Sequence, residues 1–248
     1  MTSKQTPISI FIPCLVDQVY PEMGLAMVKV LEHLGYSVSY DSRQTCCGQP
    51  AFNAGHWQEA RQVAGCFIDV FKDAEIIVCP SGSCTAMVRH FYSQLFAGRP
   101  QQRPAAQLAG KIFEISEFLD RQGDIEKIHG KFPGKIGFHN SCHSYRELRI
   151  ADPWQKILAQ IEGIEWAQPE GEPVCCGFGG IFSFKYAPIA TAMAKTRLEM
   201  FVEKGAETII SNDPGCIMHM RQQAAAQGLE VNILHLVEFL QQAMLAPA

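Results

Sequence analysis

Two copies of the triplet Cys-Cys-Gly are the part of this sequence with the clearest chemical meaning. One copy begins at Cys46 and the other at Cys175. A disulfide between adjacent cysteines would need a strained ring, so it is a poor explanation for either copy. Thiolates are soft ligands that select iron–sulfur clusters, zinc or Cu(I). The doubled cysteine therefore predicts a metal centre, and its second copy predicts two.

Each triplet lies in the middle of a longer cysteine pattern that occurs twice. In the first copy, 31 residues separate a single cysteine from the pair that follows it, and 36 residues separate the pair from a last cysteine. The corresponding numbers in the second copy are 32 and 39. Cysteines that only filled a hydrophobic core would not be expected to repeat at matching spacings in both halves. The pattern gives two sets of four predicted metal ligands, Cys14, Cys46, Cys47 and Cys84 in the first set and Cys142, Cys175, Cys176 and Cys216 in the second.

Other landmarks repeat in the same order, which indicates an internal duplication. An arginine follows the last cysteine of each set after five residues, at Arg89 and Arg221, and both halves close on the triplet Glu-Phe-Leu. We predict a first repeat over residues 1–128 and a second over residues 129–248, with the seam in the segment 127–135.

Strand-like apolar runs and helical patterns alternate along both repeats. The expected strands are 8–12, 36–40, 75–79, 135–139, a short one before Cys175, and 208–212, and the expected helices are 21–34, 57–71, 154–161 and 188–202. This alternation predicts an α/β fold of two pseudo-twofold-related halves, each a mostly parallel sheet flanked by helices. Ligand sites of parallel sheets lie at the carboxyl ends of the strands, so the metal sites are expected there.

The adjacent cysteines also bear on which metal is bound. Neighbouring side chains tend to diverge, so they reach two metal atoms more readily than one, and structural zinc sites usually space their paired ligands. An iron–sulfur cluster is therefore the favoured occupant, and zinc is the alternative.

Several other residues are candidates for chemistry near these sites. Arg89 and Arg221 could meet near the pseudo-twofold axis and hold a cluster's charge or a carboxylate substrate, since the arginine fork matches a carboxylate. His143 and His139, both expected in exposed loops, are candidates for proton transfer, and His219 is another. The glycine of each triplet could donate its backbone N–H to a cysteine sulfur. Cys66, in an apolar helical stretch, is expected to be a core residue.

Composition narrows the class of protein. The 248 residues are 47% hydrophobic and 19% charged, with a net charge of -4 and no run of lysine and arginine. A nucleic-acid partner is therefore not expected. The N-terminus has no secretory signal pattern, and no stretch approaches the roughly 20 apolar residues of a membrane helix. We expect a cytoplasmic protein, in which ten cysteines serve as metal ligands or reactive thiols.

Four stretches of the sequence, CLVDQVYP, CCGQPAFNAG, PSGSCTAM and CCGFGGIFS, carry a resemblance to a known family. With the cysteine spacing, they resemble the duplicated cysteine-rich CCG domain. That domain is shared by the B subunit of heterodisulfide reductase, the iron–sulfur subunit of glycolate oxidase and the lactate utilisation protein A family. The resemblance covers nearly the whole chain and is strongest to the last of these.

The resemblance implies an iron–sulfur electron-transfer subunit of a cytosolic oxidoreductase complex. Such a complex oxidises L-lactate, or a related small 2-hydroxy acid, to the 2-oxo acid, and uses one or two clusters of the 4Fe-4S type. The implied partners are a LutB-like ferredoxin-type iron–sulfur protein and a LutC-like protein, through which the chain could lie peripheral to the inner membrane. Two other functions stay open, a thiol–disulfide reductase subunit and a zinc-bound scaffold without redox activity, as does catalysis by the isolated chain.

One departure from the family concerns the ligand set. In the heterodisulfide reductase pattern the last cysteine belongs to a Cys-x-x-Cys pair, whereas Ser81 and Asp213 occupy the first position of that pair here. These two residues, and Cys79 nearby, are additional candidate ligands.

Overall fold

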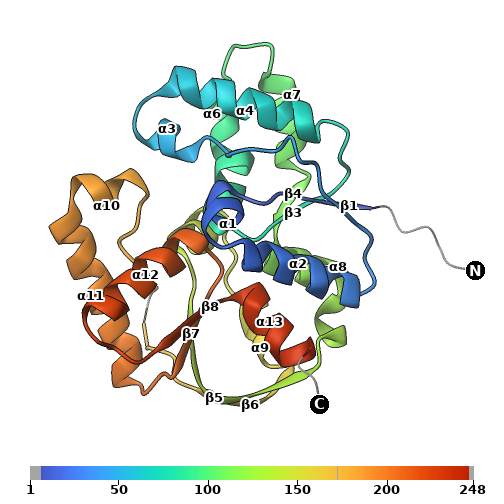
Figure 1. Cartoon of the computed structure of the whole chain (residues 1–248). Coiled ribbons are helices and arrows are strands. Elements are labelled where there is room, and N and C mark those ends of the chain that lie inside the picture. Colours follow the sequence, from blue (N-terminus) through green and yellow to red (C-terminus); the bar gives the residue numbers. More distant parts are fainter. Residues whose placement is uncertain (1–6, 172, 246–248) are drawn as a thin grey trace, which may run out of the picture.

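The chain forms two α/β halves, which lie one above the other in Figure 1. The computed structural model describes residues 7–171 and 173–245. The first half contains a four-stranded sheet in the order β2-β1-β3-β4, and the second a sheet in the order β6-β5-β7-β8. Every strand pairs with its neighbours in parallel. These observations confirm the predicted fold of two parallel sheets flanked by helices.

The elements alternate as the sequence predicts, with short strands in the first half. The strands are β1 (Ile8–Ile10), β2 (Val38–Ser39), β3 (Ile77–Cys79), β4 (Ile112–Glu114), β5 (Gly130–His139), β6 (Ile161–Trp166), β7 (Thr208–Ser211) and β8 (Asn232–His235). The helices are α1 (Cys14–Val19), α2 (Pro21–His33), α3 (Gln49–Asn53), α4 (Trp57–Phe71), α5 (Gly82–Ala86), α6 (Tyr92–Leu95), α7 (Gln102–Ala109), α8 (Ile115–Gln122), α9 (Pro153–Leu158), α10 (Ile181–Lys185), α11 (Ala187–Glu203), α12 (Pro214–Ala226) and α13 (Leu236–Leu245). Two π-helical turns (Met87–Phe91 and His143–Glu147) and a 3-10 turn (Asp124–Lys127) complete them.

The strand order determines where a ligand site can form. In each sheet the chain leaves the first strand to one side and later returns to its other side, so the order reverses between β1 and β3, and between β5 and β7. Sheets of this kind bind ligands in the crevice at that point, outside the carboxyl ends of the strands. Because the two sheets share this strand order, one such crevice is expected in each half.

One hydrophobic core ties the two halves together, and a second lies within the first half. Alternate residues of a strand point to opposite faces of a sheet. Ile8 and Ile10 of β1 face a core that continues into the second half, whereas Phe11 packs into a separate core under α4. Helices α2 and α13 lie side by side across the junction in Figure 1. The halves thus share apolar packing as well as a polypeptide connection.

Two sequence predictions about local structure differ from what is found. Strand β5 begins at Gly130, so most of the expected seam 127–135 belongs to the second sheet. The strand expected just before Cys175 ends at Trp166, and the described residues between it and the doubled cysteine, 167–171 and 173–174, belong to no helix or strand. Among the described helices, none is long and apolar enough to cross a membrane.

His235 links the two halves and makes the stability of the protein depend on pH. Its Nε2 lies 2.9 Å from the Pro80 carbonyl oxygen of the first half, and its Nδ1 accepts a hydrogen bond from the Val237 N–H at 3.1 Å. Burial lowers the pKa of this imidazole to about 4 from an ordinary value of 6.5. The unfolded chain therefore takes up this proton first on acidification. Stability present above pH 6.5 is lost as the pH falls towards 4, by up to about 3 kcal/mol.

We expect His235→Gln to be less stable than the wild type at pH 7.5 and to lose less further stability by pH 4.5. Urea unfolding at both pH values measures the two free energies. His33→Gln, at an exposed histidine, is the control and should keep the wild-type pH dependence. An equal loss on acidification in wild type and His235→Gln would contradict the assignment.

Candidate metal centre

All eight predicted ligands line one cavity that both halves enclose, with a volume of about 320 Å³. Cys14 is the first residue of α1, directly after β1, and Cys84 lies in the first turn of α5, after β3. Cys216 lies in the first turn of α12, after β7. The carboxyl ends of the two sheets therefore face each other across the cavity.

The first set of thiols shows how adjacent cysteines are used. The Sγ atom of Cys46 lies 3.6 Å from that of Cys14, whereas the Sγ atom of Cys47 lies 3.4 Å from that of Cys84. Each member of the pair thus has its own partner outside the pair, and a hydrogen bond also joins Cys46 to Cys47. All four are free thiols, and their separations are much longer than the roughly 2.05 Å of a disulfide bond.

The second set repeats this arrangement. Cys176 and Cys216 approach to 3.0 Å between their Sγ atoms, and Cys175 is hydrogen-bonded to Cys142. Two thiolates on one tetrahedral metal atom are about 3.8 Å apart for metal–sulfur bonds of about 2.3 Å. The thiols lie closer together than this, so their sulfur atoms would have to move apart around a metal; four free thiols gathered in each half are nevertheless a soft donor set of the kind that binds a metal or a cluster.

Each half also contains one thiol that ionises easily. The hydrogen bond from Cys14 lowers the pKa of Cys46 to about 3, and the bond from Cys142 lowers the pKa of Cys175 to about 2. The same bonds raise the pKa of Cys14 and of Cys142, because they hold the proton on the donor. A metal bound by these thiolates would displace the remaining protons.

The glycine of each triplet bends the chain so that its N–H meets sulfur. Gly48 and Gly177 have φ angles of 86° and 85°, which favour glycine. Each backbone N–H donates to the Sγ atom two residues earlier, Cys46 and Cys175 respectively, at 3.4 Å. The backbone donor predicted from the sequence is therefore present in both halves.

Substitution of these glycines should destabilise both loops, and the second more. A Cβ atom on Gly177 would lie 2.6 Å from the Ala190 carbonyl oxygen, whereas one on Gly48 would lie 3.1 Å from the Ala60 carbonyl oxygen. We expect Gly177→Ala to cost about 3 kcal/mol, from the positive φ angle and the overlap together, and Gly48→Ala about 2 kcal/mol.

Urea unfolding of the metal-free protein measures these costs without any contribution from metal binding. Gly65→Ala is the matched control, because a Cβ at this position in α4 meets nothing within 4 Å. It should stabilise the chain by about 1 kcal/mol through helix propensity. A tolerated Gly177→Ala substitution would show that the loop can relax.

The three additional candidate ligands already have protein partners. The Ser81 hydroxyl accepts a hydrogen bond from the Cys84 N–H at 3.3 Å and donates to Asp213 Oδ2 at 3.2 Å. Asp213 also accepts from the Ser83 and Gly215 N–H groups, at 2.8 and 3.0 Å. The two residues cap the helices that carry the last cysteines, and Cys79 is buried in the core under α4.

Arg89 and Arg221 differ from the expectation that they meet near the pseudo-twofold axis. Each pairs with the glutamate of the Glu-Phe-Leu triplet in its own half, Arg89 with Glu117 at 2.7 Å and Arg221 with Glu238 at 3.3 Å. Neither arginine lines the cavity. The two repeated sequence features thus form one repeated ion pair, which joins the helical segment that carries the arginine to the helix after the last strand of its sheet.

The candidate histidines have different surroundings. His143 lines the cavity, with Nε2 3.2 Å from Gln49 Nε2 of the first half. His219 is buried and bonds to the Ala190 carbonyl oxygen. His139 was expected in an exposed loop, which is wrong, because β5 carries it into the interior. Cys66 is also misplaced by the sequence, since it lies on the exposed side of α4.

No motif in the sequence singles out Arg197, a buried cation beside the second set of thiols. It lies on α11, and its Nε donates to His139 Nδ1 at 3.1 Å. Burial lowers its pKa to about 10, while Cys176 and Cys216 act in the opposite direction. One ring nitrogen of His139 and the Sγ atoms of Cys176 and Cys216 lie within 4.8 Å of one another.

Comparisons with known proteins identify two matching segments and several relatives. Residues 8–89 and 136–221 each match the cysteine-rich CCG domain. The chain is 37% identical to lactate utilization protein A of Oceanobacillus iheyensis over 94% of this chain and 96% of the relative. It is 36% identical to the protein of that name from Bacillus subtilis, over 94% and 98%. A putative Asp/Glu racemase from Yersinia pestis covers 95% of this chain and 96% of its own, at 14% identity and a TM-score of 0.39, which is too low to support an argument.

Proposed function

The chain belongs to the CCG cysteine-rich domain family and, within it, to the lactate utilization protein A family, and from this membership we propose that it is an iron–sulfur electron-transfer subunit. The complex it serves would oxidise L-lactate, or a related 2-hydroxy acid, to the 2-oxo acid. The observation that carries the proposal is the convergence of two matched sets of four free thiols on one cavity.

The proposal assigns four thiolate ligands to each half, Cys14, Cys46, Cys47 and Cys84 in the first and Cys142, Cys175, Cys176 and Cys216 in the second. A cluster held there would supply one-electron transfer. The glycine N–H groups at Gly48 and Gly177 would hold the doubled-cysteine loops in place around it. We also place the boundary of the repeats between residues 128 and 129, just before β5.

The lining of the cavity supports electron transfer over substrate binding. Among the described residues that line it, none is an arginine or lysine. His143 is the one side chain among them that can carry a positive charge, so a carboxylate substrate would find no arginine or lysine there, and the 2-hydroxy acid is better placed on a partner subunit. The partners in this proposal are a LutB-like ferredoxin-type protein and a LutC-like protein.

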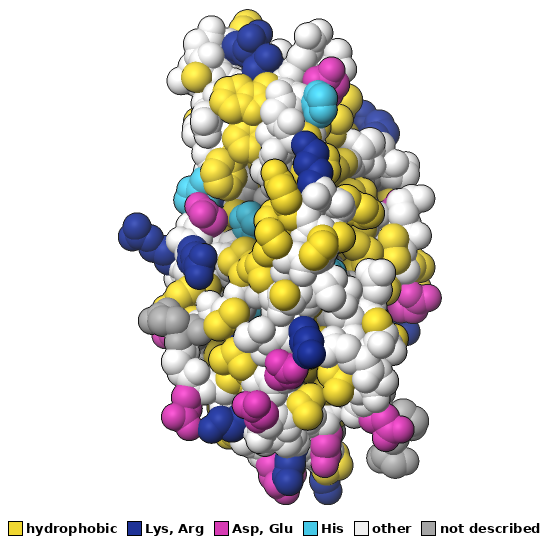
Figure 2. Space-filling view, turned by 90° about the vertical axis from the view of Figure 1, so that its left-hand side faces the viewer, with side chains coloured by type: hydrophobic (Ala, Val, Ile, Leu, Met, Phe, Trp, Pro, Cys, Tyr) yellow, Lys and Arg dark blue, Asp and Glu magenta, His cyan; other side chains and the backbone are white. Residues whose placement is uncertain are grey.

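The surface beside the cavity is suited to docking one of these partners. Figure 2 shows the side of the molecule on which α10 and α11 lie, and hydrophobic side chains gather across its middle. Phe184, which also lines the cavity, is 79% exposed, and Tyr186 and Ile189 are more than half exposed. We place the complex in the cytosol, where free thiols persist, with any membrane contact made through the partners.

The test is anaerobic purification of the chain with its partners, followed by iron, sulfide and zinc analysis. We expect iron and labile sulfide in this subunit, and cluster reduction on addition of L-lactate only when the partners are present. One zinc atom per half without labile sulfide would contradict electron transfer by this chain and would favour the zinc-bound scaffold without redox activity. Reduction of a disulfide substrate by the isolated chain with an artificial donor would favour the thiol–disulfide reductase.

A further inference from the structure

The two thiol sites differ at one matched pair of positions. Phe11 and His139 each lie three residues before the first cysteine of their set. The glycines of the two triplets contact Ala60 on α4 and Ala190 on α11, so these two helices occupy equivalent places.

Phe67 and Arg197 each lie seven residues beyond those alanines. The pair Phe11 and Phe67 of the first half is therefore replaced by His139 and Arg197 in the second.

In the first half this pair is entirely apolar. The rings of Phe11 and Phe67 meet edge to face, with centroids 4.8 Å apart. Both side chains are buried in the core that also contains Cys47 and Cys84. They offer no hydrogen-bond donor and no charge to the first set of thiols.

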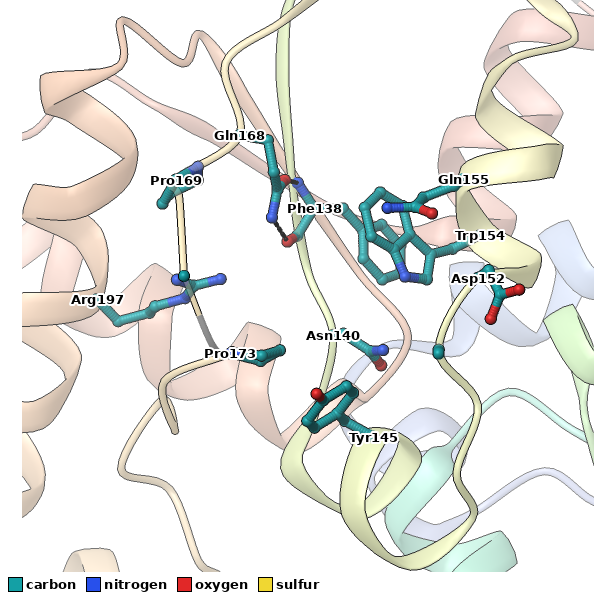
Figure 3. Close-up of a pocket in the computed structure, with 12 residues that line it drawn as sticks. Phe138, Asn140, Tyr145, Asp152, Trp154, Gln155, Gln168, Pro169, Pro173 and Arg197 are labelled. Atoms are coloured by element: carbon teal, nitrogen blue, oxygen red, sulfur yellow. Dashed lines mark hydrogen bonds between the residues drawn. The ribbon is translucent and has the colours of Figure 1, made fainter.

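In the second half the same space contains a buried hydrogen-bonded pair. Arg197 Nε donates to His139 Nδ1, and the guanidinium packs over the Phe201 ring at 4.2 Å from its centroid. Figure 3 shows Arg197 extending from α11, with Gln168, Phe138 and Trp154 on the other side of a neighbouring pocket. His139 and Arg197 are 0% and 2% exposed, so water screens the pair only weakly.

The arginine determines which ring nitrogen of His139 carries the proton. A guanidinium can only donate, so Nδ1 must act as the acceptor. The single proton of the neutral ring is then on Nε2. This atom is buried and has no hydrogen-bond partner among the described residues, and the ring lies beside Cys176 and Cys216.

We propose that the Nε2–H of His139 donates a hydrogen bond to a sulfur of the cluster in the second half, and that this bond and the Arg197 charge make that cluster the more easily reduced of the two. This inference rests on the function proposed above. Reduction adds negative charge to a cluster, and both a donor N–H and a nearby cation stabilise that charge. The first half has phenylalanines at both positions, so its cluster lacks both effects.

The same geometry argues against His139 as a metal ligand. A histidine that ligates through Nε2 usually donates its Nδ1–H to an acceptor. With Arg197 donating to Nδ1, ligation through Nε2 would require an imidazolate. The donor role needs no such deprotonation.

One charge opposes the effect and must be tested separately. Asp213 lies at the cavity, where its carboxylate bonds to Ser83 of the first half and Gly215 of the second. Because it contacts both halves, its charge acts on both clusters. Asp213→Asn should therefore raise both potentials, whereas changes at His139 and Arg197 should affect one.

The experiment is an anaerobic redox titration monitored by EPR, on protein shown by analysis to contain iron and sulfide. Cys47→Ser and Cys176→Ser, which disrupt one site each, assign the two potentials to the halves. The test variant is His139→Phe/Arg197→Phe, which copies the first half, and the reciprocal variant is Phe11→His/Phe67→Arg. His139→Gln, which retains an N–H donor, is the conservative variant.

We expect the second-half cluster of the wild type to have the higher potential. The double phenylalanine variant should lower that potential by at least about 59 mV, which corresponds to a tenfold change in the equilibrium constant for one-electron reduction. The potential of the first-half cluster should not change. His139→Gln should restore part of the difference, and the reciprocal variant should raise the first-half potential.

Two unshifted potentials in a protein that retains both clusters would overturn this inference alone. Loss of iron from the second site in His139→Gln would show that His139 is a ligand, which also overturns it. If the reciprocal variant does not fold, the titrations of the double phenylalanine variant and of His139→Gln still test the proposed role of His139 and Arg197. Wild-type protein without labile sulfide would overturn the proposed function and this inference with it.

Discussion

Cys47→Ser is expected to remove about half of the iron and labile sulfide from the protein, and Cys176→Ser the other half. These are the buried members of the two doubled cysteines. Their Sγ atoms lie 3.4 and 3.0 Å from the Sγ atom of the last cysteine of the same set. A serine hydroxyl is a harder and far less acidic ligand than a thiol, so a soft metal centre is not held in its place. The double variant should contain neither iron nor sulfide.

Anaerobic purification with iron and sulfide analysis measures this result for each variant. Cys66→Ser is the matched control, because Cys66 is an exposed thiol on the outer side of α4. It should keep the full metal content. A full iron content in Cys47→Ser would refute the ligand assignment in the first half, and loss of all iron in either single variant would show that the sites do not load independently.

Asp213→Ala should lower the free energy of unfolding by about 3 kcal/mol, since it breaks hydrogen bonds to charge and a helix cap together. The carboxylate accepts from Gly215 at the start of α12 and from the Ser83 N–H of the other half. It is 3% exposed, so water cannot easily replace these bonds. The loss should therefore weaken the contact between the halves as well as the helix that carries Cys216.

Urea unfolding of the metal-free protein gives this free energy, and metal analysis of the same variant gives a second result. Asp213→Asn keeps an oxygen acceptor and should cost less than the alanine change. If Asp213→Ala is as stable as the wild type but lacks iron in the second half, then Asp213 is a metal ligand and not a cap.

The sequence located most of the elements because their patterns are local. The helix expected at 57–71 coincides with α4, and the apolar runs after residues 74 and 207 form β3 and β7. The strand expected at 36–40 is shorter in the structure, where only Val38 and Ser39 pair with β1. At Cys66 the apolar neighbourhood misled the prediction, since one position on a helix can face solvent while its neighbours are buried.

The arginines show a second limit of sequence reasoning. The repetition of Arg89 and Arg221, and of the two Glu-Phe-Leu triplets, was visible along the chain. Their pairing was not, since 28 and 17 residues separate the partners. A charged side chain can reach a substrate, a cluster or another side chain, and only the packing of a helix against its sheet selects among them.

The sequence by itself determined the duplication, the α/β class and the two sets of four cysteines, because spacing and hydrophobic period are properties of the chain. The tertiary structure decided that both sets face one cavity, that Asp213 bridges the halves, and that a histidine and an arginine replace two phenylalanines beside the second set. These facts depend on which residues distant in sequence become neighbours. Burial then strengthens their interactions by removing water, an effect that no local pattern encodes.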